Sequence, residues 1–358
     1  MMMSSTTCSI STTTTAEEHG GGATAITAVH PDIIQTHILT RLDGPTLAST
    51  SCASSHLHTL CTEENLWKKI CNSNWPSTAH AGVQDAVSRF PSGHRSFYSD
   101  SFPALHQHHH QPAARRRPKS KNNENNMFDT LELISAVDVH YGSELVYSKV
   151  IMTETVSGWF MCSPFRIDLL APKEIVPAPV KFDGEEGKCM ARVEENMRLS
   201  WIVIDPAKKR ALNLSSLRPV EIRRHWLTGE IQVLYATAMA AGGASSGVCG
   251  EFVNCKVVVT CGGKDGGDLQ VREISMQVED MEGKIINGKD SLVILHDAME
   301  GKRRKREIGE EKMMHEMFLE SRREWRLRKQ NRERRLDMVC VAAGVSIFMA
   351  FWMFVLFG

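Results

Sequence analysis

Residues 29–71 read VHPDIIQTHILTRLDGPTLASTSCASSHLHTLCTEENLWKKIC, and this stretch decides how the chain is organised. Pro31 and Asp32 suit a first helical turn. Proline lacks a backbone N–H, but the N–H groups of a first turn have no partner within the helix, and a carboxylate there interacts favourably with the helix dipole. The apolar residues that follow recur at helical spacing and are Ile33, Ile34, Ile38, Leu39 and Leu42. The turn Asp43-Gly44-Pro45 predicts the end of this first helix.

Two further helical pieces complete the stretch. The second is rich in small residues and contains Leu47 and Cys52, and the third contains Leu57, Leu66 and Trp67. Three short helices in about forty residues can bury little surface, so such a unit needs a partner or the rest of the chain. A generic three-helix fragment of a larger helical domain is the alternative interpretation.

The order of these features resembles an F-box over about residues 29–75. The resemblance is carried by a proline followed by an acidic and two apolar residues, the helix end Leu39-Thr40-Arg41-Leu42, a turn, the small-residue helix and the closing Leu66-Trp67-Lys68-Lys69-Ile70. The chain departs from the family pattern at His30, where the family usually has leucine. It departs again at Ser55-His56-Leu57, where the family often has basic residues or tryptophan.

An F-box implies docking on a Skp-type adaptor and, through it, on a cullin. The chain would then be a substrate-recruiting subunit of an SCF-type ubiquitin ligase, without catalytic residues of its own. The adaptor-binding residues that the resemblance implies are Pro31, Ile33, Ile34, Ile38, Leu39, Leu42, Leu47, Leu66 and Trp67. Some of these would lie in the interface, and others would hold the helices together.

Composition divides the regions that flank this F-box. Residues 1–28 are mainly Ser, Thr, Ala and Gly, cannot bury enough apolar area to offset chain entropy, and are expected to be disordered. Residues 76–105 predict a short helical extension that packs on the last F-box helix. Residues 106–126 form a low-complexity linker. Its basic residues between 115 and 121 are either a solvated linker or, less favoured, a nuclear import signal.

Residues 127–300 predict at least eight strands. The expected strands include 131–139, 144–152, 158–162, 198–205, 218–226, 230–238, 251–260, 269–279 and 291–296. No helical pattern intervenes between them, so a mostly antiparallel sandwich or barrel is expected, and it would select an unknown protein substrate. Whether it binds protein, glycan or a small molecule stays open.

The expected β-rich domain offers no pattern for chemistry. Its histidines, His140, His225 and His296, are joined by no nucleophile motif, and its glycine pairs lack the lysine of a phosphate loop. The ten cysteines include no closely spaced pair, so a zinc site is not expected, and neither is any other metal or cofactor. The chain has 42 basic and 42 acidic residues, which gives no reason to expect nucleic acid. An enzyme with its site in this domain is the less favoured alternative.

Residues 301–336 and 337–358 differ sharply from what precedes them. Between 302 and 335 the chain has 14 Lys/Arg and 7 Glu, a net of +7, and helix formers dominate, so a basic juxtamembrane helix is expected. Residues 338–358 contain no charge and, at about 1.5 Å rise per residue, span roughly 30 Å, the thickness of a hydrocarbon core. A buried core helix is the weaker interpretation, because such a segment has no polar face.

The predicted fold is therefore α+β: a three-helix F-box, a mostly antiparallel β domain, and a basic helix that runs into a single transmembrane tail anchor. The basic block places the bulk of the chain on the cytosolic side and could attract anionic lipid. A nuclear location is the weaker alternative. A membrane-tethered scaffold that uses its F-box outside a ligase is the alternative function.

Overall fold

A computed structural model describes residues 29–105, 130–181, 186–242, 248–264, 266–305 and 309–357. The expected disordered start at 1–28, and the expected linker at 106–126, lie outside these residues. The fold mixes helix and sheet, and the chain divides into two compact units, Met1–Leu66 and Trp67–Gly358. We describe each unit by itself.

The first unit is a series of short helices, each with a local reason to begin. Its elements are α2 (Pro31–Ile33), η1 (Ile34–Ile38), η2 (Leu39–Arg41), α3 (Gly44–Thr50), α4 (Ser55–Cys61) and the start of α5 (Glu64–Asn74). The Asp43 carboxylate caps α3 by accepting from the Thr46 N–H at 3.0 Å, and this bond lowers the pKa of Asp43. The Ser54 hydroxyl caps α4 by accepting from the Leu57 N–H at 3.2 Å. The third predicted helical piece is thus two helices, α4 and α5.

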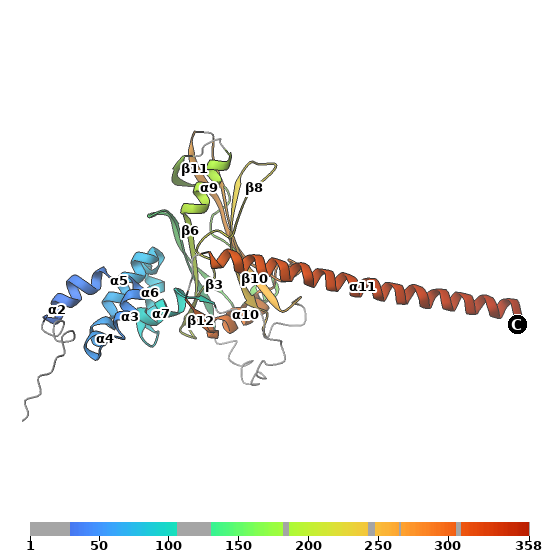
Figure 1. Ribbon diagram of the computed structural model, residues 1–358, viewed down its shortest axis with the longest axis horizontal. Helices are drawn as coiled ribbons and strands as arrows, with labels where there is room; N and C mark the ends of the chain where they lie inside the picture. Colours follow the sequence, from blue (N-terminus) through green and yellow to red (C-terminus); the bar gives the residue numbers. More distant parts are fainter. Residues whose placement is uncertain are drawn as a thin grey trace, which may run out of the picture. The chain divides into compact units, whose positions relative to one another are not determined.

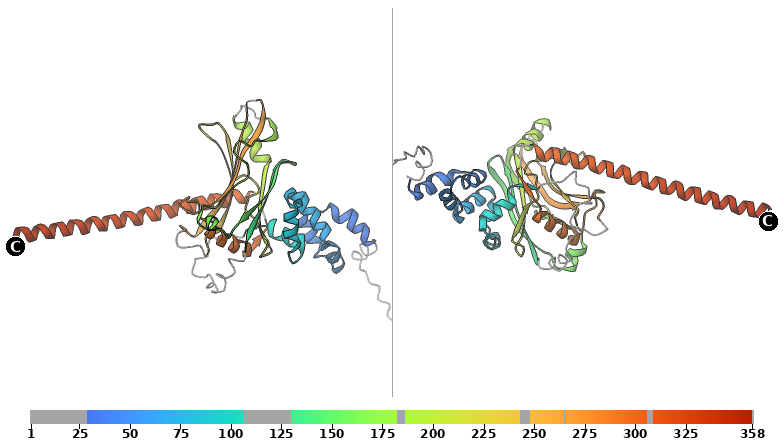
Figure 2. Two further views of the ribbon diagram at one scale, coloured as in Figure 1. Left: turned by 180° about the vertical axis from the view of Figure 1, so that it is seen from behind. Right: turned by 60° about the horizontal axis from the view of Figure 1, so that its bottom comes forward.

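In the residues that the structure describes, the second unit contains two large antiparallel sheets (Figures 1 and 2). The four-stranded sheet has the order β3-β2-β6-β7, with β2 (Glu132–Tyr141), β3 (Glu144–Glu154), β6 (Met197–Asp205) and β7 (Arg210–Asn213). The six-stranded sheet has the order β4-β11-β10-β9-β8, and β5 also pairs with β11. Its strands are β4 (Arg166–Asp168), β5 (Val176–Lys181), β8 (Glu221–Arg224), β9 (Ile231–Ala240), β10 (Phe252–Gly262) and β11 (Asp268–Glu279). One hydrophobic core takes side chains from both sheets.

Helices surround and interrupt these sheets. They are η3 (Pro76–Ala79), α6 (Ala81–Ser88), α7 (Gly93–Ser101), α8 (Gly158–Cys162), α9 (Glu186–Asn196), α10 (Gly288–Glu300) and α11 (Glu310–Phe357). A two-stranded ribbon pairs β1 (Ala104–Leu105) with β12 (Arg303–Arg304). The expectation of strands without intervening helices is therefore wrong.

Two predicted strands are helices, for identifiable reasons. Residues 291–296 are rich in β-formers but lie in α10, because the Asn287 side chain accepts from the Asp290 N–H at 2.8 Å and caps a helix there. Residues 158–162 form α8, where the Ser157 hydroxyl accepts from the Phe160 N–H at 3.3 Å. Five short strands were not predicted, since two to six residues carry little periodic signal; they are β1, β4, β5, β7 and β12.

The basic segment also differs from its prediction. Helix α11 begins at Glu310 rather than near residue 301, and Arg303 and Arg304 are in strand β12. From Glu310 to Phe357 the helix is continuous, as Figure 1 shows. The predicted basic helix and the predicted apolar span are thus one element.

Candidate adaptor-binding surface and substrate domain

In the first helical region, an unusual backbone hydrogen-bond register determines which apolar residues are buried and which are exposed. Residues Ile34–Ile38 form a π-turn, and the Leu39 N–H donates to the Ile34 carbonyl five residues back. A π-turn has more residues per turn than an α-helix, so residues five apart share a face. Ile34 and Leu39 are accordingly both buried, while Ile33 and Ile38 are 50% and 49% exposed.

The nine predicted adaptor-binding residues separate into two groups. Ile34, Leu39, Leu47, Leu66 and Trp67 are buried. Pro31, Ile33 and Ile38 are exposed, and Leu42 is half-buried. Without unfolding the helices, an adaptor could reach the exposed group and the exposed part of Leu42. Burial of the other five residues supports those helices. Helical spacing alone could not separate the groups, because it does not anticipate the π-turn.

Aromatic packing joins α5 to the helices that follow it within the second unit. The rings of Trp67 and Tyr98 have centroids 5.3 Å apart, and Trp75 packs on Phe97 at 5.8 Å. The Trp75 indole N–H also donates to the Ser200 hydroxyl on β6 at 3.1 Å. Because all of this lies in a buried region, the end of α5 is held firmly against the β domain.

A buried carboxylate makes a second connection. Asp138 on β2 accepts from the Ser77 N–H at 2.9 Å, from the Ser77 hydroxyl at 2.5 Å and from the Ser148 hydroxyl at 2.7 Å. Burial raises the pKa of Asp138, and these hydrogen bonds oppose that increase. Since η3 contains Ser77, the carboxylate ties this turn to the four-stranded sheet.

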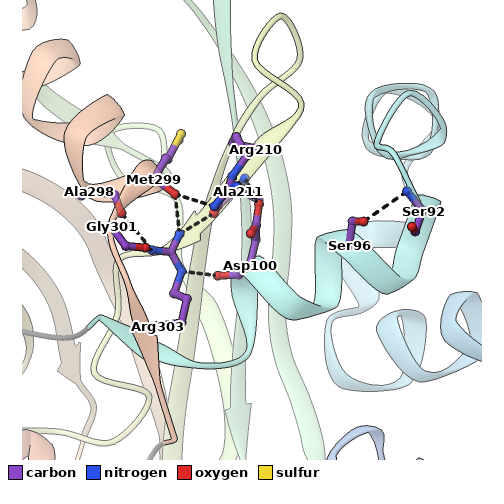
Figure 3. Close-up of polar contacts among 9 residues, drawn as sticks. All are labelled: Ser92, Ser96, Asp100, Arg210, Ala211, Ala298, Met299, Gly301 and Arg303. Atoms are coloured by element: carbon purple, nitrogen blue, oxygen red, sulfur yellow. Dashed lines mark hydrogen bonds and ion pairs between the residues drawn. The ribbon is translucent and has the colours of Figure 1, made fainter. Parts of the chain in front are cut away.

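Arg303 makes a third connection, drawn in Figure 3. Its guanidinium donates to five main-chain carbonyls, those of Asp100, Ala211, Ala298, Met299 and Gly301, at 2.9 to 3.3 Å. The Asp100 carboxylate accepts from the Ala211 N–H at 3.1 Å and lies 3.0 Å from Arg210. At the start of α7 the Ser96 hydroxyl accepts from the Ser92 N–H at 3.1 Å. Helices α7 and α10 and strands β7 and β12 therefore meet at Arg303, a residue that the sequence assigned to a juxtamembrane helix.

The closest arrangement to a catalytic site is the buried group Asp205, His296 and Thr130. His296 Nε2 lies 2.8 Å from Asp205 Oδ2, and the Thr130 hydroxyl donates to the same oxygen at 2.6 Å. Burial raises the pKa of Asp205, but the hydrogen bonds from His296, Thr130 and the Lys208 N–H, together with the charge interaction with His296, leave that pKa below its ordinary value. The other carboxylate oxygen accepts from two N–H groups of the β6–β7 turn. With all three side chains buried, the group supports that turn and has no access for a substrate.

The cysteines of β10 belong to the core. Cys255 and Cys261 are fully buried, and burial raises the pKa of the Cys261 thiol to about 12. A protonated, enclosed thiol is a poor nucleophile and a poor metal ligand. In the residues that the structure describes, no three His, Cys, Asp or Glu side chains gather in a way that could hold a metal ion.

Helix α11 has a docked part and an exposed part. Phe318 is buried against Ala238 and Met281, and His315 is buried nearby. Further along, Arg322 donates to the Met281 carbonyl at 3.0 Å, and Lys329 pairs with Glu282. Residues 331–357 are exposed throughout. By length and composition this is the one helix, among the described residues, that could cross a membrane.

Comparison with known proteins identifies relatives but no template. No family model matches the chain, and no solved structure matches it. An F-box protein of Arabidopsis thaliana is 42% identical over 347 residues, covering 93% of this chain and 96% of the relative. A probable F-box protein from the same plant is 43% identical over 335 residues, covering 92% of this chain and 93% of the relative. A third F-box protein of that plant is 43% identical over 290 residues, covering 80% of this chain and 77% of the relative.

Because these matches cover more than nine-tenths of this chain, they extend beyond residues 29–75 into the β-rich unit. The resemblance inferred from residues 29–75 therefore extends to the rest of the chain. The chain belongs to the F-box proteins of plants.

Proposed function

We propose that the chain is a substrate-recruiting subunit of an SCF-type ubiquitin ligase, held at a cytosol-facing membrane. Residues 29–75 would act as the F-box that binds a Skp-type adaptor and, through it, a cullin. The β-rich unit, which we infer to be a sandwich of its two sheets, would bind the protein substrate. The ligase chemistry would belong to the partners.

The observation that carries this proposal is the exposed apolar group Pro31, Ile33 and Ile38 in a chain of the F-box family. Isoleucine side chains that stay half exposed in a small helical unit leave apolar area available for a partner. At about 25 cal/mol per Å², covering such side chains is a favourable contribution to binding. Ile34 and Leu39 in the same helical region are buried and support it.

Adaptor binding is tested with two aspartates on this surface. The double variant Ile33→Asp, Ile38→Asp should fail to co-purify with the adaptor, because it would desolvate charges in an apolar interface. Thr40→Asp is the matched control, since Thr40 is exposed in the same region but is not apolar. The milder pair Pro31→Ala, Ile33→Ala should show the same loss to a smaller degree. Undiminished adaptor binding by the aspartate variant would reject the docking role.

Recovery of cullin separates a ligase subunit from a scaffold. A pull-down of the full chain that recovers both the adaptor and a cullin supports the ligase role. A pull-down that recovers the adaptor without cullin would instead favour an F-box that acts outside a ligase.

The membrane proposal rests on residues 338–357, which are uncharged and exposed along their whole length. An exposed apolar helix of this length is unstable in water and stable in a bilayer. The basic residues that precede it, among them Arg332, Arg334 and Arg335, favour a cytosolic position for the bulk of the chain. Protease added to intact membranes should therefore degrade both units, and protection of either unit would contradict this topology.

A further inference from the structure

The tip of the β8–β9 hairpin, residues 225–230, exposes two large apolar side chains. Trp226 is 88% exposed, more than any other large apolar residue in the part of the chain that the structure describes. Leu227 beside it is 70% exposed. These side chains contribute little to the core, so their apolar area is available to a partner.

Hydrogen bonds within the tip support its backbone. The His225 N–H donates to the Glu230 carbonyl at 2.7 Å, and the Gly229 N–H donates to the His225 carbonyl at 2.9 Å. Gly229 has φ +69°, which a side chain would disfavour. The ring of Trp226 stacks on that of His225. These bonds restrict the backbone of the tip, so the backbone has little further entropy to lose when a partner binds.

The accessible charge beside the tip is positive. The carboxylate of Glu230 lies 2.8 Å from Arg272 and also accepts from the Thr228 hydroxyl at 3.1 Å. Arg223 is exposed, and its Nε donates to a neutral group, the Gln232 amide oxygen, at 2.9 Å. A guanidinium on a neutral partner can still bind a carboxylate, and interface hot spots are enriched in tryptophan and arginine.

The position of the tip on the sheet favours a protein over the bilayer as its partner. Helix α11 packs at the other end of β9, where Phe318 contacts Ala238, and it leaves the domain past Glu282. Ala238 is seven residues from Ile231, the β9 residue next to the tip, which is roughly 23 Å along a strand. The segment that we propose to enter the membrane therefore departs from the end of the sheet remote from Trp226.

We propose that this tip is the substrate-contacting surface of the β-rich unit, and that it binds an acidic protein segment carrying a large apolar side chain. The apolar side chain packs on Trp226 and Leu227, and a neighbouring carboxylate bonds to Arg223. This inference rests on the proposed function and names the chemistry of the substrate.

The test uses the full chain in detergent micelles and a phage-displayed library of random peptides as the probe. Enriched peptides should carry Asp or Glu beside Leu, Phe or Trp. Their synthetic forms should lose roughly 30-fold in affinity for Trp226→Ala, the loss typical of a hot-spot tryptophan. Trp159→Ala is the matched control, because Trp159 is 82% exposed on α8 and should not affect binding.

Charge reversal tests the role of the arginine. Arg223→Glu should lose the acidic peptides and gain the same peptides with lysine in place of the acids. Equal binding by wild type and Trp226→Ala, or enrichment of peptides without acidic residues, would overturn the proposal. So would Trp226-dependent binding to phosphatidylserine vesicles or Trp226-dependent self-association in place of peptide binding.

A parallel adaptor pull-down distinguishes this inference from the proposed function. Trp226→Ala should retain the adaptor, since it lies outside residues 29–75. A wild-type chain that binds the adaptor but no acidic peptide would refute the role of the tip and leave the proposed function intact. Peptide binding without any adaptor refutes the ligase role and leaves the tip as a binding surface.

Discussion

Replacing Arg303 by alanine should destabilise the second unit. The guanidinium donates to five main-chain carbonyls, and the three shortest of these bonds are 2.9, 2.9 and 3.1 Å long. At about 1 kcal/mol net for each of these three bonds, the loss is about 3 kcal/mol. A change of that size corresponds to a decrease in Tm of about 6 °C or more in a unit of this size.

Thermal unfolding of the full chain in mild detergent, followed by tryptophan fluorescence, measures this effect. Arg303→Lys should lie between wild type and alanine, because an ammonium has three donors and cannot reproduce the planar fork of a guanidinium. Arg332→Ala is the control, since Arg332 is exposed on α11 and its loss should leave Tm unchanged. A Tm for Arg303→Ala within about 1 °C of wild type would refute the structural role. If Arg303→Ala bound anionic vesicles more weakly but kept the wild-type Tm, Arg303 would have the juxtamembrane role expected from the sequence instead of the structural one.

Four further predictions concern α11 and the connection before the β domain. Phe318→Ala should cost about 3 kcal/mol or more and release the docked part of α11, which faster trypsin cleavage between residues 310 and 329 would show. Burial lowers the pKa of His315 below its ordinary 6.5. Docking of α11 should therefore be complete above pH 6.5 and weaken as the pH falls below 6.5, which the trypsin cleavage rate would show. In His315→Gln the cleavage rate should no longer depend on pH in this range. Trp75→Phe should lower the free energy of unfolding by about 1 kcal/mol through the lost bond to Ser200, and an unchanged urea midpoint would contradict that role. Deleting residues 337–358 should move the chain to the soluble fraction, and a truncated chain that still sediments with membranes would argue against the span.

Most strands that the sequence predicted correctly are long. Strands β2, β9, β10 and β11 each extend over ten or more residues, and their β-branched runs are read without any knowledge of neighbours. Residues 291–296 have the same composition but form part of α10. There the local cap at Asn287, and burial of Leu292 and Leu295 in the shared core, prevail over β propensity. Propensity is a weak prior wherever capping and tertiary burial agree against it.

The sequence by itself determined the family resemblance, the apolar and uncharged character of residues 338–358, and the existence of long antiparallel strands. Local composition and spacing are sufficient for each of these. Only the tertiary structure decided which apolar residues of the first helix remain exposed, because a π-turn places Ile34 and Leu39 inside and leaves Ile33 and Ile38 outside. Only the tertiary structure, too, shows that Arg303, which in the sequence is one charge in a basic run, is the donor that joins α7, α10 and β7. Hydrogen bonds between residues two hundred positions apart leave no local pattern in a chain.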